Sequence, residues 1–358
     1  MAYTTIDDPS AYFQTVIWTG DGNDDRSITF DGNSDMQPDM VWTKRRPTAS
    51  SHGLRDSTRG AVVELFPDDT AMDTSVADRF QAFESDGFQV GTNADINGTS
   101  NNTYVAWGWK GASSGISVSE SGTSDDSLNA CTHYANQDAG FSIVKFTGNN
   151  GSISNGEETR VTHGLGAVPE FIIIKSRDTA QSWVVQQDDN WNDYHLVLDT
   201  TAAGSGSLYT GNHASTTSAY FIVGNADLVN KADDEFIAYV WKGVQGYSKF
   251  GVYTGNDNAN GPFIYLGFKP SFIMIKKTDT TGNWIIKDNK IDPDNPATQV
   301  IYANLSNAEN AAQDIDLLSN GFKHRSAEGD GNDANDYIYM AFAESPFVTS
   351  SGVPATAR

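Results

Sequence analysis

The chain has 358 residues, and its 23 basic against 46 acidic side chains give a formal net charge of −23 at neutral pH. This negative charge repels phosphate groups, so we expect no nucleic-acid partner and no anionic membrane surface as partner. The single cysteine, Cys131, excludes an internal disulfide framework. Residues 1–10 are polar, and no apolar run approaches the roughly 18 residues of a membrane-spanning helix. We therefore expect neither membrane insertion nor export by a signal of its own.

One sequence pattern occurs three times along the chain. A short aromatic-Thr-Gly run comes first, then a proline that opens a β-branched stretch ending in lysine six residues later, then a phenylalanine, and finally an alternating aromatic run. The aromatic-Thr-Gly runs begin at Trp18, Phe146 and Tyr253; the proline–lysine pairs are Pro38 and Lys44, Pro169 and Lys175, Pro270 and Lys276; the phenylalanines are Phe88, Phe221 and Phe322; the closing runs are Tyr104–Gly111, Phe236–Gly243 and Tyr337–Glu344.

These landmarks divide the chain into three copies with distinct connections. We predict copy 1, preceded by an N-terminal arm, at 1–111, copy 2 at 141–243 and copy 3 at 244–347. The segment 112–140 is rich in Ser, Gly, Asp and Asn, which favours a polar linker or a long surface loop. Residues 348–358 form a small, polar C-terminal tail. Because so few residues join copies 2 and 3, we expect these two to be docked rigidly.

The recurring runs are short, alternating and rich in β-branched and aromatic residues, which is typical of strands. We therefore predict an all-β fold of three tandem β-sandwich repeats, of jelly-roll or lectin-like type. One helix is expected at 304–318, where Ser306 and Glu309 have the spacing of a capping box. A weaker helical signal lies at 74–83, and copy 2 has the glycine- and serine-rich run 204–207 in the corresponding region.

The sequence offers little support for catalysis. Metalloprotease, P-loop, paired-cysteine and nucleophile-elbow motifs are all absent. Cys131 and His133 are close enough in sequence to suggest a nucleophile and its base, but they fall in the segment 112–140, where nothing would hold their geometry. We interpret Cys131 as a non-catalytic thiol. The six histidines lack metal-ligand spacing: His52, His133, His163, His195, His213 and His324.

Neighbouring acids give the strongest argument for an enzyme, because two carboxyl groups can together hydrolyse a polysaccharide. The candidates are Glu157 with Glu158, Asp188 with Asp189, and the run 233–235. Consecutive residues of a strand point to opposite faces, however, and 46 acids produce such neighbours by composition alone. We therefore predict no catalytic residues and no cofactor, with a polysaccharide-degrading enzyme as an alternative.

Acidic turns raise the question of calcium. Asp21, Asn23 and Asp25 provide oxygen atoms at positions one, three and five of a calcium loop. Arg26 stands where such a loop needs glycine, and Gly32 where it needs glutamate. Similar turns occur at 330–333 and 256–258. We predict solvated turns and assign no metal ligands, while calcium binding at these tips stays open.

The tryptophans divide into two groups. Residues that recur at the same position of the repeat are expected in the core, because each copy must build the same interior. These are Trp107, Trp109, Trp183, Trp241 and Trp284; the less regular Trp18, Trp42 and Trp191 are alternative surface contacts for a sugar.

The landmarks also carry a family resemblance. The residues concerned are Met1–Ile6 with Tyr12 and Phe13, the Tyr-Thr-Gly-Asn turn, Gly267–Pro270, Leu318–Phe322 and Tyr337–Phe347. With these motifs nearly the whole chain resembles uncharacterised virion-associated proteins of marine tailed bacteriophages, including those that infect cyanobacteria. That resemblance implies a tail-fibre, receptor-binding or capsid-surface component, and it carries no catalytic residues.

We therefore predict a non-enzymatic structural protein on the outside of a bacteriophage particle, in the tail or its fibres, that takes part in host attachment. Capsid decoration is the first alternative and a polysaccharide-degrading tailspike the second. The protein would be made in the host cytoplasm and localise to the virion. Its expected partners are other virion proteins, further copies of itself, and a host-surface glycan or protein met by loop tips such as 20–25 and 256–261.

Overall fold

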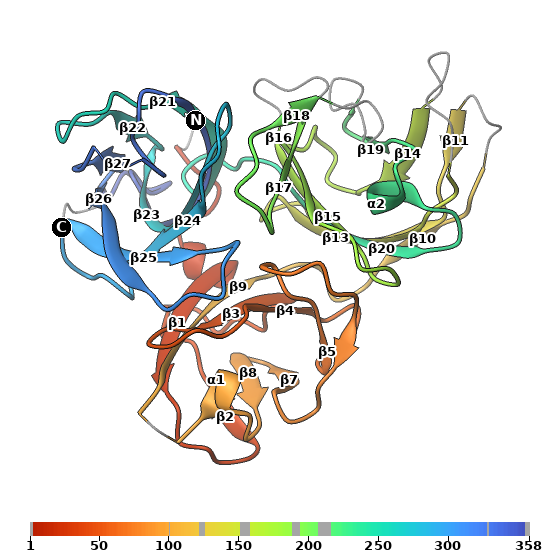
Figure 1. Cartoon of the computed structure of the whole chain (residues 1–358), viewed down its shortest axis with the longest axis horizontal. Coiled ribbons are helices and arrows are strands. Elements are labelled where there is room, and N and C mark those ends of the chain that lie inside the picture. The colour runs from red at the N-terminus through yellow and green to blue at the C-terminus, as the bar shows by residue number, and fades with distance from the viewer. Residues whose placement is uncertain are drawn as a thin grey trace.

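The computed structural model describes residues 3–99, 101–121, 126–150, 158–187, 194–206, 216–327 and 329–354. These residues are almost entirely β-structure (Figure 1), which confirms the all-β class. The short helical elements among them are η1 (Pro9–Ala11), α1 (Ala94–Asn97) and α2 (Asp227–Asn230).

The strands follow the three copies along the chain. Copy 1 contains β1 (Phe13–Thr19), β2 (Arg26–Ile28), β3 (Met40–Arg45), β4 (Gly53–Asp56), β5 (Val63–Glu64), β6 (Thr74–Ser75), β7 (Phe80–Glu84), β8 (Gly87–Val90) and β9 (Thr103–Trp109). From residue 112 to 243 lie β10 (Ile116–Val118), β11 (Asp126–Leu128), β12 (Cys131–Asn136), β13 (Phe141–Thr147), β14 (Glu158–Thr162), β15 (Phe171–Ser176), β16 (Val184–Gln187), β17 (Tyr194–Val197), β18 (Ser205–Gly206), β19 (Tyr220–Val223) and β20 (Glu235–Trp241). Copy 3 contains β21 (Ser248–Thr254), β22 (Phe263–Tyr265), β23 (Phe268–Lys277), β24 (Trp284–Asp288), β25 (Ala297–Tyr302), β26 (Asn310–Leu318), β27 (Gly321–His324) and β28 (Asp336–Pro346).

Each copy contains the same row of four antiparallel strands, which we call its inner sheet. The strand order is β1-β9-β3-β4 in copy 1, β13-β20-β15-β16 in copy 2 and β21-β28-β23-β24 in copy 3. In each row the aromatic run that closes the copy is central, between the Thr-Gly strand and the Pro–Lys strand. In copies 2 and 3 these rows belong to larger eight-stranded sheets.

Every inner sheet is covered on both faces. Its outer face packs against the remaining strands of the same copy; in copy 1, for example, Trp18 and Tyr104 of the inner sheet share a core with Phe80 and Phe88 of β7 and β8. Comparable cores form in copies 2 and 3. Burial on both faces explains why runs such as Phe171–Ile174 are continuously apolar rather than alternating.

The inner faces of the three sheets meet in one shared core at the centre of the molecule (Figure 1). Trp109, Trp241 and Phe342 occupy the same position in their copies, and the Trp109 ring lies 6.4 Å from Trp241 and 5.6 Å from Phe342, centroid to centroid. The five recurrent tryptophans are all buried, as predicted: Trp107, Trp109, Trp183, Trp241 and Trp284. Several of the recurrent aromatic residues therefore contact other copies.

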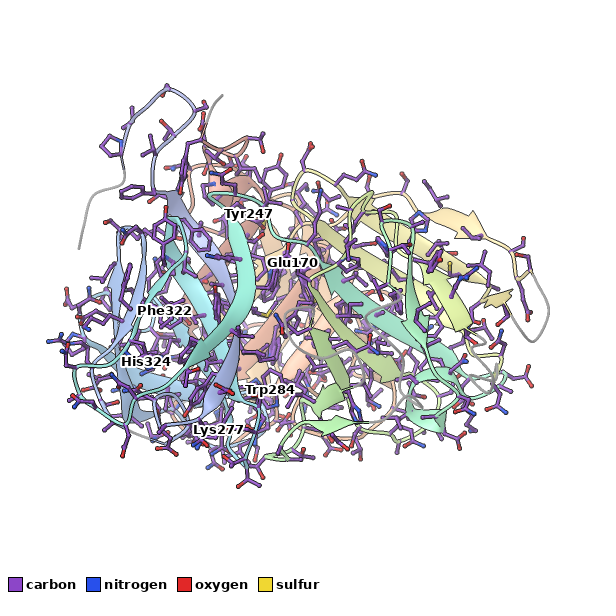
Figure 2. The ribbon with its side chains drawn as sticks, turned by 90° about the horizontal axis from the view of Figure 1, so that it is seen from above. Glu170, Tyr247, Lys277, Trp284, Phe322 and His324 are labelled. Carbon is purple, nitrogen blue, oxygen red and sulfur yellow. The ribbon has the colours of Figure 1, made fainter. Side chains whose placement is uncertain are left out.

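Hydrogen bonds at equivalent positions join the copies into a ring. At the start of the fourth inner strand, one side chain reaches a backbone carbonyl of the neighbouring copy. The pairs are His52 Nε2 with Tyr302 O (3.0 Å), Trp183 Nε1 with Phe66 O (2.9 Å) and Trp284 Nε1 with Val197 O (2.9 Å); Figure 2 shows Trp284 at its junction. Copy 1 thus contacts copy 3, copy 3 contacts copy 2, and copy 2 contacts copy 1. Because each copy contacts the next in the same head-to-tail manner and the third contact leads back to the first copy, the three copies form a closed ring.

The lysine that ends each Pro–Lys run supports the same junctions. Its ammonium group donates to a backbone carbonyl of the neighbouring copy. This carbonyl lies four residues after the one that His52, Trp183 or Trp284 contacts at the same junction. The pairs are Lys44 with Ser306 (3.3 Å), Lys175 with Thr70 (3.1 Å) and Lys276 with Thr201 (3.3 Å). All three lysines are buried, and burial lowers the pKa of each to about 8. The recurrent lysine therefore acts as a contact between copies.

A further contact occurs at two junctions and is lost at the third. Trp107 Nε1 donates to Asp288 of copy 3 at 3.0 Å, and the Tyr239 hydroxyl donates to Asp56 of copy 1 at 2.8 Å. At the third junction the corresponding positions are Met340 and Gln187. Met340 has no N–H or O–H to donate, and neither atom of the buried Gln187 amide has a hydrogen-bond partner among the residues that the structure describes.

The aromatic-Thr-Gly motif forms a turn that a buried asparagine holds. The backbone N–H that follows the glycine donates to an asparagine side chain in each copy: Asp21 to Asn97 (3.1 Å), Asn149 to Asn230 (3.0 Å) and Asn256 to Asn332 (3.1 Å). A Cβ atom at Gly20, Gly148 or Gly255 would collide with a backbone carbonyl, so glycine is required there.

Two expectations about local structure were wrong. The segment 112–140 is no mere linker, because β12 pairs with β13 along its length and places Cys131 opposite Phe146. Its inward residues, Cys131 and His133, are weakly apolar, so the alternation was inconspicuous. The helix expected at 304–318 is replaced by β26, in which Ile315 and Leu317 are buried at a spacing of two.

The weaker helical signal and the expected capping box also have other structures. The residues at 74–83 form β6 and the start of β7, with Phe80 in the core. Glu309 forms an ion pair with Arg46 across a junction at 2.7 Å, and its backbone N–H donates to the Arg46 carbonyl. Tertiary contacts, rather than local propensity, decide these segments.

Candidate functional site

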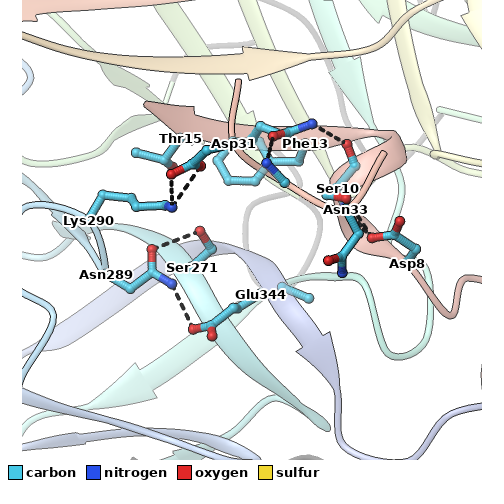
Figure 3. A pocket seen from close by; sticks show the side chains of 13 residues that line it. Asp8, Ser10, Phe13, Thr15, Asp31, Asn33, Ser271, Asn289, Lys290 and Glu344 are labelled. Atoms are coloured by element: carbon cyan, nitrogen blue, oxygen red, sulfur yellow. Dashed lines mark hydrogen bonds and ion pairs between the residues drawn. The ribbon is translucent and has the colours of Figure 1, made fainter. Parts of the chain in front are cut away.

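A polar cavity of about 250 Å3 lies at the junction of copies 1 and 3 (Figure 3). Copy 1 contributes the start of β1, the residues before it and the loop after β2, which holds Asp31 and Asn33. Copy 3 contributes Ser271 of β23, the turn after β24 with Asn289 and Lys290, and the end of β28. We call this cavity the junction pocket.

The copy-3 wall of the junction pocket carries connected polar groups. Lys290 Nζ lies 2.7 Å from both carboxylate oxygens of Asp31 and so bridges the two copies. Asn289 Nδ2 donates to Glu344 at 2.7 Å, and the Ser271 hydroxyl donates to Asn289 Oδ1 at 3.1 Å. Lys269 holds the other Glu344 oxygen at 2.8 Å. These contacts fix the orientation of an amide, a carboxylate and an ammonium group around one space.

The copy-1 wall is organised by Gln14. Its side-chain amide donates to the carbonyls of Ser10 and Ser34 at 2.9 and 2.8 Å, and its Oε1 accepts from the Gly32 N–H at 2.8 Å. Asp8 accepts from the hydroxyls of Ser10 and Ser34 at 2.6 and 2.7 Å. The loop is therefore held against β1 by a buried side chain, which favours a preformed wall.

One wall residue has an unmet hydrogen-bonding group. Thr15 is only 3 % exposed, and its hydroxyl has no partner among the residues that the structure describes. A buried hydroxyl without a partner costs free energy, so such groups are uncommon in native structures. Thr15 is thus a wall group that a bound molecule could satisfy.

Copy 3 departs from the repeat pattern at this pocket. Copies 1 and 2 end their closing runs with Trp-Lys-Gly, whereas copy 3 has Phe-Ala-Glu, ending at Glu344. In copy 2 the acid is instead Glu170, which faces Gly243 and accepts from its N–H at 2.7 Å. Copy 3 has Ser271 in place of Glu170, so the acid is moved across to the neighbouring strand. Ala343 also replaces a lysine, which shortens the side chain beside the cavity.

The pairing of β23 with β28 is irregular beside the pocket. Its register shifts at Lys269/Pro270 and again at Pro270/Phe272. Pro38 and Pro169 precede their strands, as expected, whereas Pro270 lies inside β23 at this irregularity. Bulges commonly occur beside functional sites, where they re-aim side chains.

These residues were not found from the sequence. The available signal was the difference between Phe342–Glu344 and the Trp-Lys-Gly endings of the other copies. A polar pocket with oriented carboxylates, an amide and an ammonium group can bind a polar ligand. Its lining residues include no cysteine or histidine.

Cys131 and His133 are held in place more firmly than expected. Both lie on β12 with their side chains on one face, and both contact the Thr162 hydroxyl, Cys131 Sγ at 3.0 Å and His133 Nδ1 at 3.1 Å. Burial raises the pKa of the Cys131 thiol and lowers that of His133. A raised thiol pKa disfavours the reactive thiolate.

The acid pairs have different outcomes. Glu157, Asp188 and Asp189 lie outside the described residues. Asp234 pairs with Lys231 at 3.1 Å, and Glu235 accepts from the Thr147 hydroxyl at 2.7 Å. These two acids are engaged in structural contacts within copy 2.

The acidic turns are also held by protein groups. Asp21 accepts from the Asn23 N–H at 2.9 Å and lies 3.5 Å from Arg26. In the other turns, Asp330 accepts from the Asn283 N–H, and Asn332 is the buried asparagine that holds the turn after Gly255. Among the residues that the structure describes, no three His, Cys, Asp or Glu side chains are grouped as a metal site would require.

The less regular tryptophans are not surface contacts where they can be placed. Trp18 is 7 % exposed and stacks on Tyr104, and Trp42 is 3 % exposed. Trp191 and His213 lie outside the described residues.

Comparison with known proteins identifies a domain family. The family described as Domain of unknown function (DUF7483) matches residues 8–346. No curated protein and no solved structure matches the chain. Within the described ranges, no helix is long and apolar enough to cross a membrane.

Proposed function

The chain belongs to this domain family of unknown function, and we propose that it is a non-enzymatic structural protein on the outside of a bacteriophage particle. We place it in the tail or its fibres, where it takes part in host attachment. The phage assignment comes from the sequence resemblance. The protein would be made in the host cytoplasm and assembled into the virion with other virion proteins.

The observation that best supports a structural role is the closed ring of three copies. At every junction a side chain at the start of the fourth inner strand contacts an equivalent backbone carbonyl of the next copy, and the three inner sheets share one core. Such an arrangement resists local opening, because loosening one copy exposes apolar surface on the other two. A rigid body of this kind suits a particle component.

We interpret each copy as a β-sandwich of jelly-roll or lectin-like type. The inner sheet would be one layer and the outer strands of the copy the other, with the separate cores described above between them. This arrangement leaves turns such as 20–25 and 256–260 at the ends of strands, where polar side chains can meet a glycan or a protein.

Labelled antibodies against the purified chain test the location. Particles of a phage that encodes this sequence should bind the antibody along the tail in electron micrographs, and pre-immune serum should leave them unlabelled. Label on the head would support capsid decoration instead. Absence of label, together with absence of the chain from purified particles by mass spectrometry, would refute the virion assignment.

The non-enzymatic assignment has its own test. Purified protein is incubated with host envelope polysaccharide, and new reducing ends are measured. No sustained release is expected. Release that disappears in a Glu344→Gln or Asp31→Asn variant would instead identify a polysaccharide-degrading tailspike.

Self-association is also a proposal. The chain already contributes three copies around one centre, so the ring itself needs no second chain. We propose that any homo-oligomer forms through surfaces outside the ring junctions, and light scattering of the full chain measures its mass.

A further inference from the structure

We infer that the junction pocket binds one neutral sugar unit. The inference deepens the attachment function and rests on it for the source of the ligand, a host-surface glycan. The binding itself is argued from the pocket, independently of where the protein is located.

The size of the cavity limits the ligand. Drug-sized ligands occupy pockets of about 300–1,000 Å3. At about 250 Å3, the junction pocket lies just below that range and suits a single ring-sized polar molecule. A longer glycan would place one unit in the pocket and the remainder outside.

The polar groups suit hydroxyl groups on adjacent carbons. A sugar hydroxyl both donates and accepts, so neighbouring hydroxyls bind well to a carboxylate beside an amide or an ammonium group. The pocket presents two such combinations: Glu344 with Asn289, both from copy 3, and Asp31 with Lys290, which meet across the junction. Figure 3 shows both combinations facing the cavity.

The charge of the lining selects against acidic sugars. Asp8, Asp31 and Glu344 contribute three carboxylates, against the ammonium groups of Lys290, which pairs with Asp31, and Lys269, which pairs with Glu344. An anionic ligand would meet a small net negative charge, which disfavours its binding although Asp31 and Glu344 are partly exposed to water. A neutral sugar meets no such barrier.

The unpartnered Thr15 hydroxyl is the independent observation that points to a ligand. Thr15 lines this pocket, and its hydroxyl is buried without a partner among the described residues. A ligand hydroxyl seated against this wall would supply the missing hydrogen bond. The departure of copy 3 from the repeat pattern at Ala343 and Glu344 occurs at the same place, so this wall differs chemically from the corresponding regions of copies 1 and 2.

The test is isothermal titration calorimetry of the full chain with glucose, galactose, N-acetylglucosamine and, as the charged probe, galacturonate. At least one neutral sugar should bind with a stoichiometry of one, and galacturonate should bind more weakly. Thr15→Val keeps the side-chain shape but removes the hydroxyl, and it should weaken binding of that sugar roughly tenfold. Thr19→Val, on the exposed end of the same strand, is the matched control and should bind like the unmodified chain.

Stability separates a binding effect from misfolding. Thr15→Val removes an unsatisfied group, so its unfolding midpoint should not fall, whereas its sugar affinity should. Glu344→Gln should also lower the affinity. The inference is overturned if none of the three neutral sugars binds, or if Thr15→Val binds as tightly as the unmodified chain. Either result leaves the particle location, which antibody labelling measures separately, unaffected.

Discussion

The indole N–H of Trp284 donates to the carbonyl oxygen of Val197 at 2.9 Å, and these residues belong to different copies of the repeat. The same contact joins Trp183 to Phe66 and His52 to Tyr302. The three acceptor residues also occupy equivalent positions. Each one directly follows a residue that pairs with the fourth inner strand of its own copy, and these preceding residues are Leu65, Leu196 and Ile301. The three copies therefore form a ring in which every member uses the same two surfaces.

The first prediction concerns the hydrogen bond of Trp284. Trp284→Phe should lower the free energy of unfolding more than Trp241→Phe does, by about 1–2 kcal/mol. Both substitutions shorten a buried indole by a similar volume. Trp284→Phe leaves the Val197 carbonyl without its cross-junction donor, whereas the Trp241 Nε1 has no partner among the described residues and so loses none. Urea unfolding at neutral pH, followed by tryptophan fluorescence and circular dichroism, measures the difference. Equal losses would mean that only packing matters at this position.

The second prediction concerns the junction where the repeat contact is missing. Gln187 is 4 % exposed, and its amide has no partner within the described part of the chain, opposite the position where copies 1 and 2 have Trp107 and Tyr239. Gln187→Met should raise the free energy of unfolding by about 1 kcal/mol, because it removes a buried amide and keeps the volume. Thermal unfolding checks this. The exposed Gln37→Met should give no gain, and a loss of stability in Gln187→Met would show that the amide has an unseen partner.

The third prediction concerns the exchange of large and small side chains in copy 1. At the position of Trp42, copies 2 and 3 have the smaller Ile173 and Met274. At the position of His52, they have the larger Trp183 and Trp284. Trp42 Nε1 donates to His52 Nδ1 at 2.9 Å, so His52 carries its proton on Nε2 and donates it to Tyr302. His52→Trp alone should overpack this site, and Trp42→Ile alone should leave a cavity, each costing about 1–4 kcal/mol.

The double variant Trp42→Ile/His52→Trp should recover most of that loss, since it copies the arrangement of copy 2. The coupling energy from a double-mutant cycle in urea measures the recovery. Additive losses would contradict the equivalence of these positions.

The fourth prediction follows from the histidine at this junction. Burial lowers the pKa of His52 to about 3, well below the value of about 6.5 in an unfolded chain. Between these values the unfolded chain binds more protons than the folded one, so acid lowers the stability as pH falls below about 6.5. Unfolding midpoints at pH 7 and pH 4.5 should therefore differ more for the unmodified chain than for Trp42→Ile/His52→Trp, which lacks this histidine. An equal drop in both proteins would exclude His52 as a source of acid sensitivity.

Sequence reasoning predicted the repeats but not how they assemble. The recurrence of Trp183, Trp284 and the lysines shows that these positions matter in each copy, yet a pattern does not tell whether a side chain faces its own core or a neighbour. Lysine at the end of a strand ordinarily suggests a solvated position, whereas Lys175 and Lys276 are fully buried. The shared core of the three inner sheets could therefore not be inferred.

Local signals failed where tertiary contacts compete with them. Glu309 fits a capping box by spacing, but its partner is Arg46 in another copy. Cys131 and His133 alternate inward on β12 although neither is strongly apolar, so the composition of 112–140 suggested a loop. The junction pocket combines residues that are up to 336 positions apart, from Asp8 to Glu344, and only the closed ring brings them together.

The last prediction concerns the three junction lysines. Burial lowers the pKa of Lys44, Lys175 and Lys276 to about 8, against about 10.4 in an unfolded chain. Between pH 8 and pH 10 the unfolded chain binds more protons at these groups, so their titration stabilises the fold as pH rises. Lys276→Met removes one such group together with its bonds to Thr201 and Gly282.

Relative to the unmodified chain, Lys276→Met should lose more stability at pH 9.5 than at pH 7, because only the unmodified chain gains from releasing the proton. Urea unfolding at both pH values measures the two differences. Lys242→Met, which alters a half-buried lysine outside the junctions, is the matched control for removing a lysine side chain. A loss for Lys276→Met that does not grow with pH would mean that Lys276 keeps its proton in the folded ring, and that its contact with Thr201 is made by a charged ammonium throughout this range.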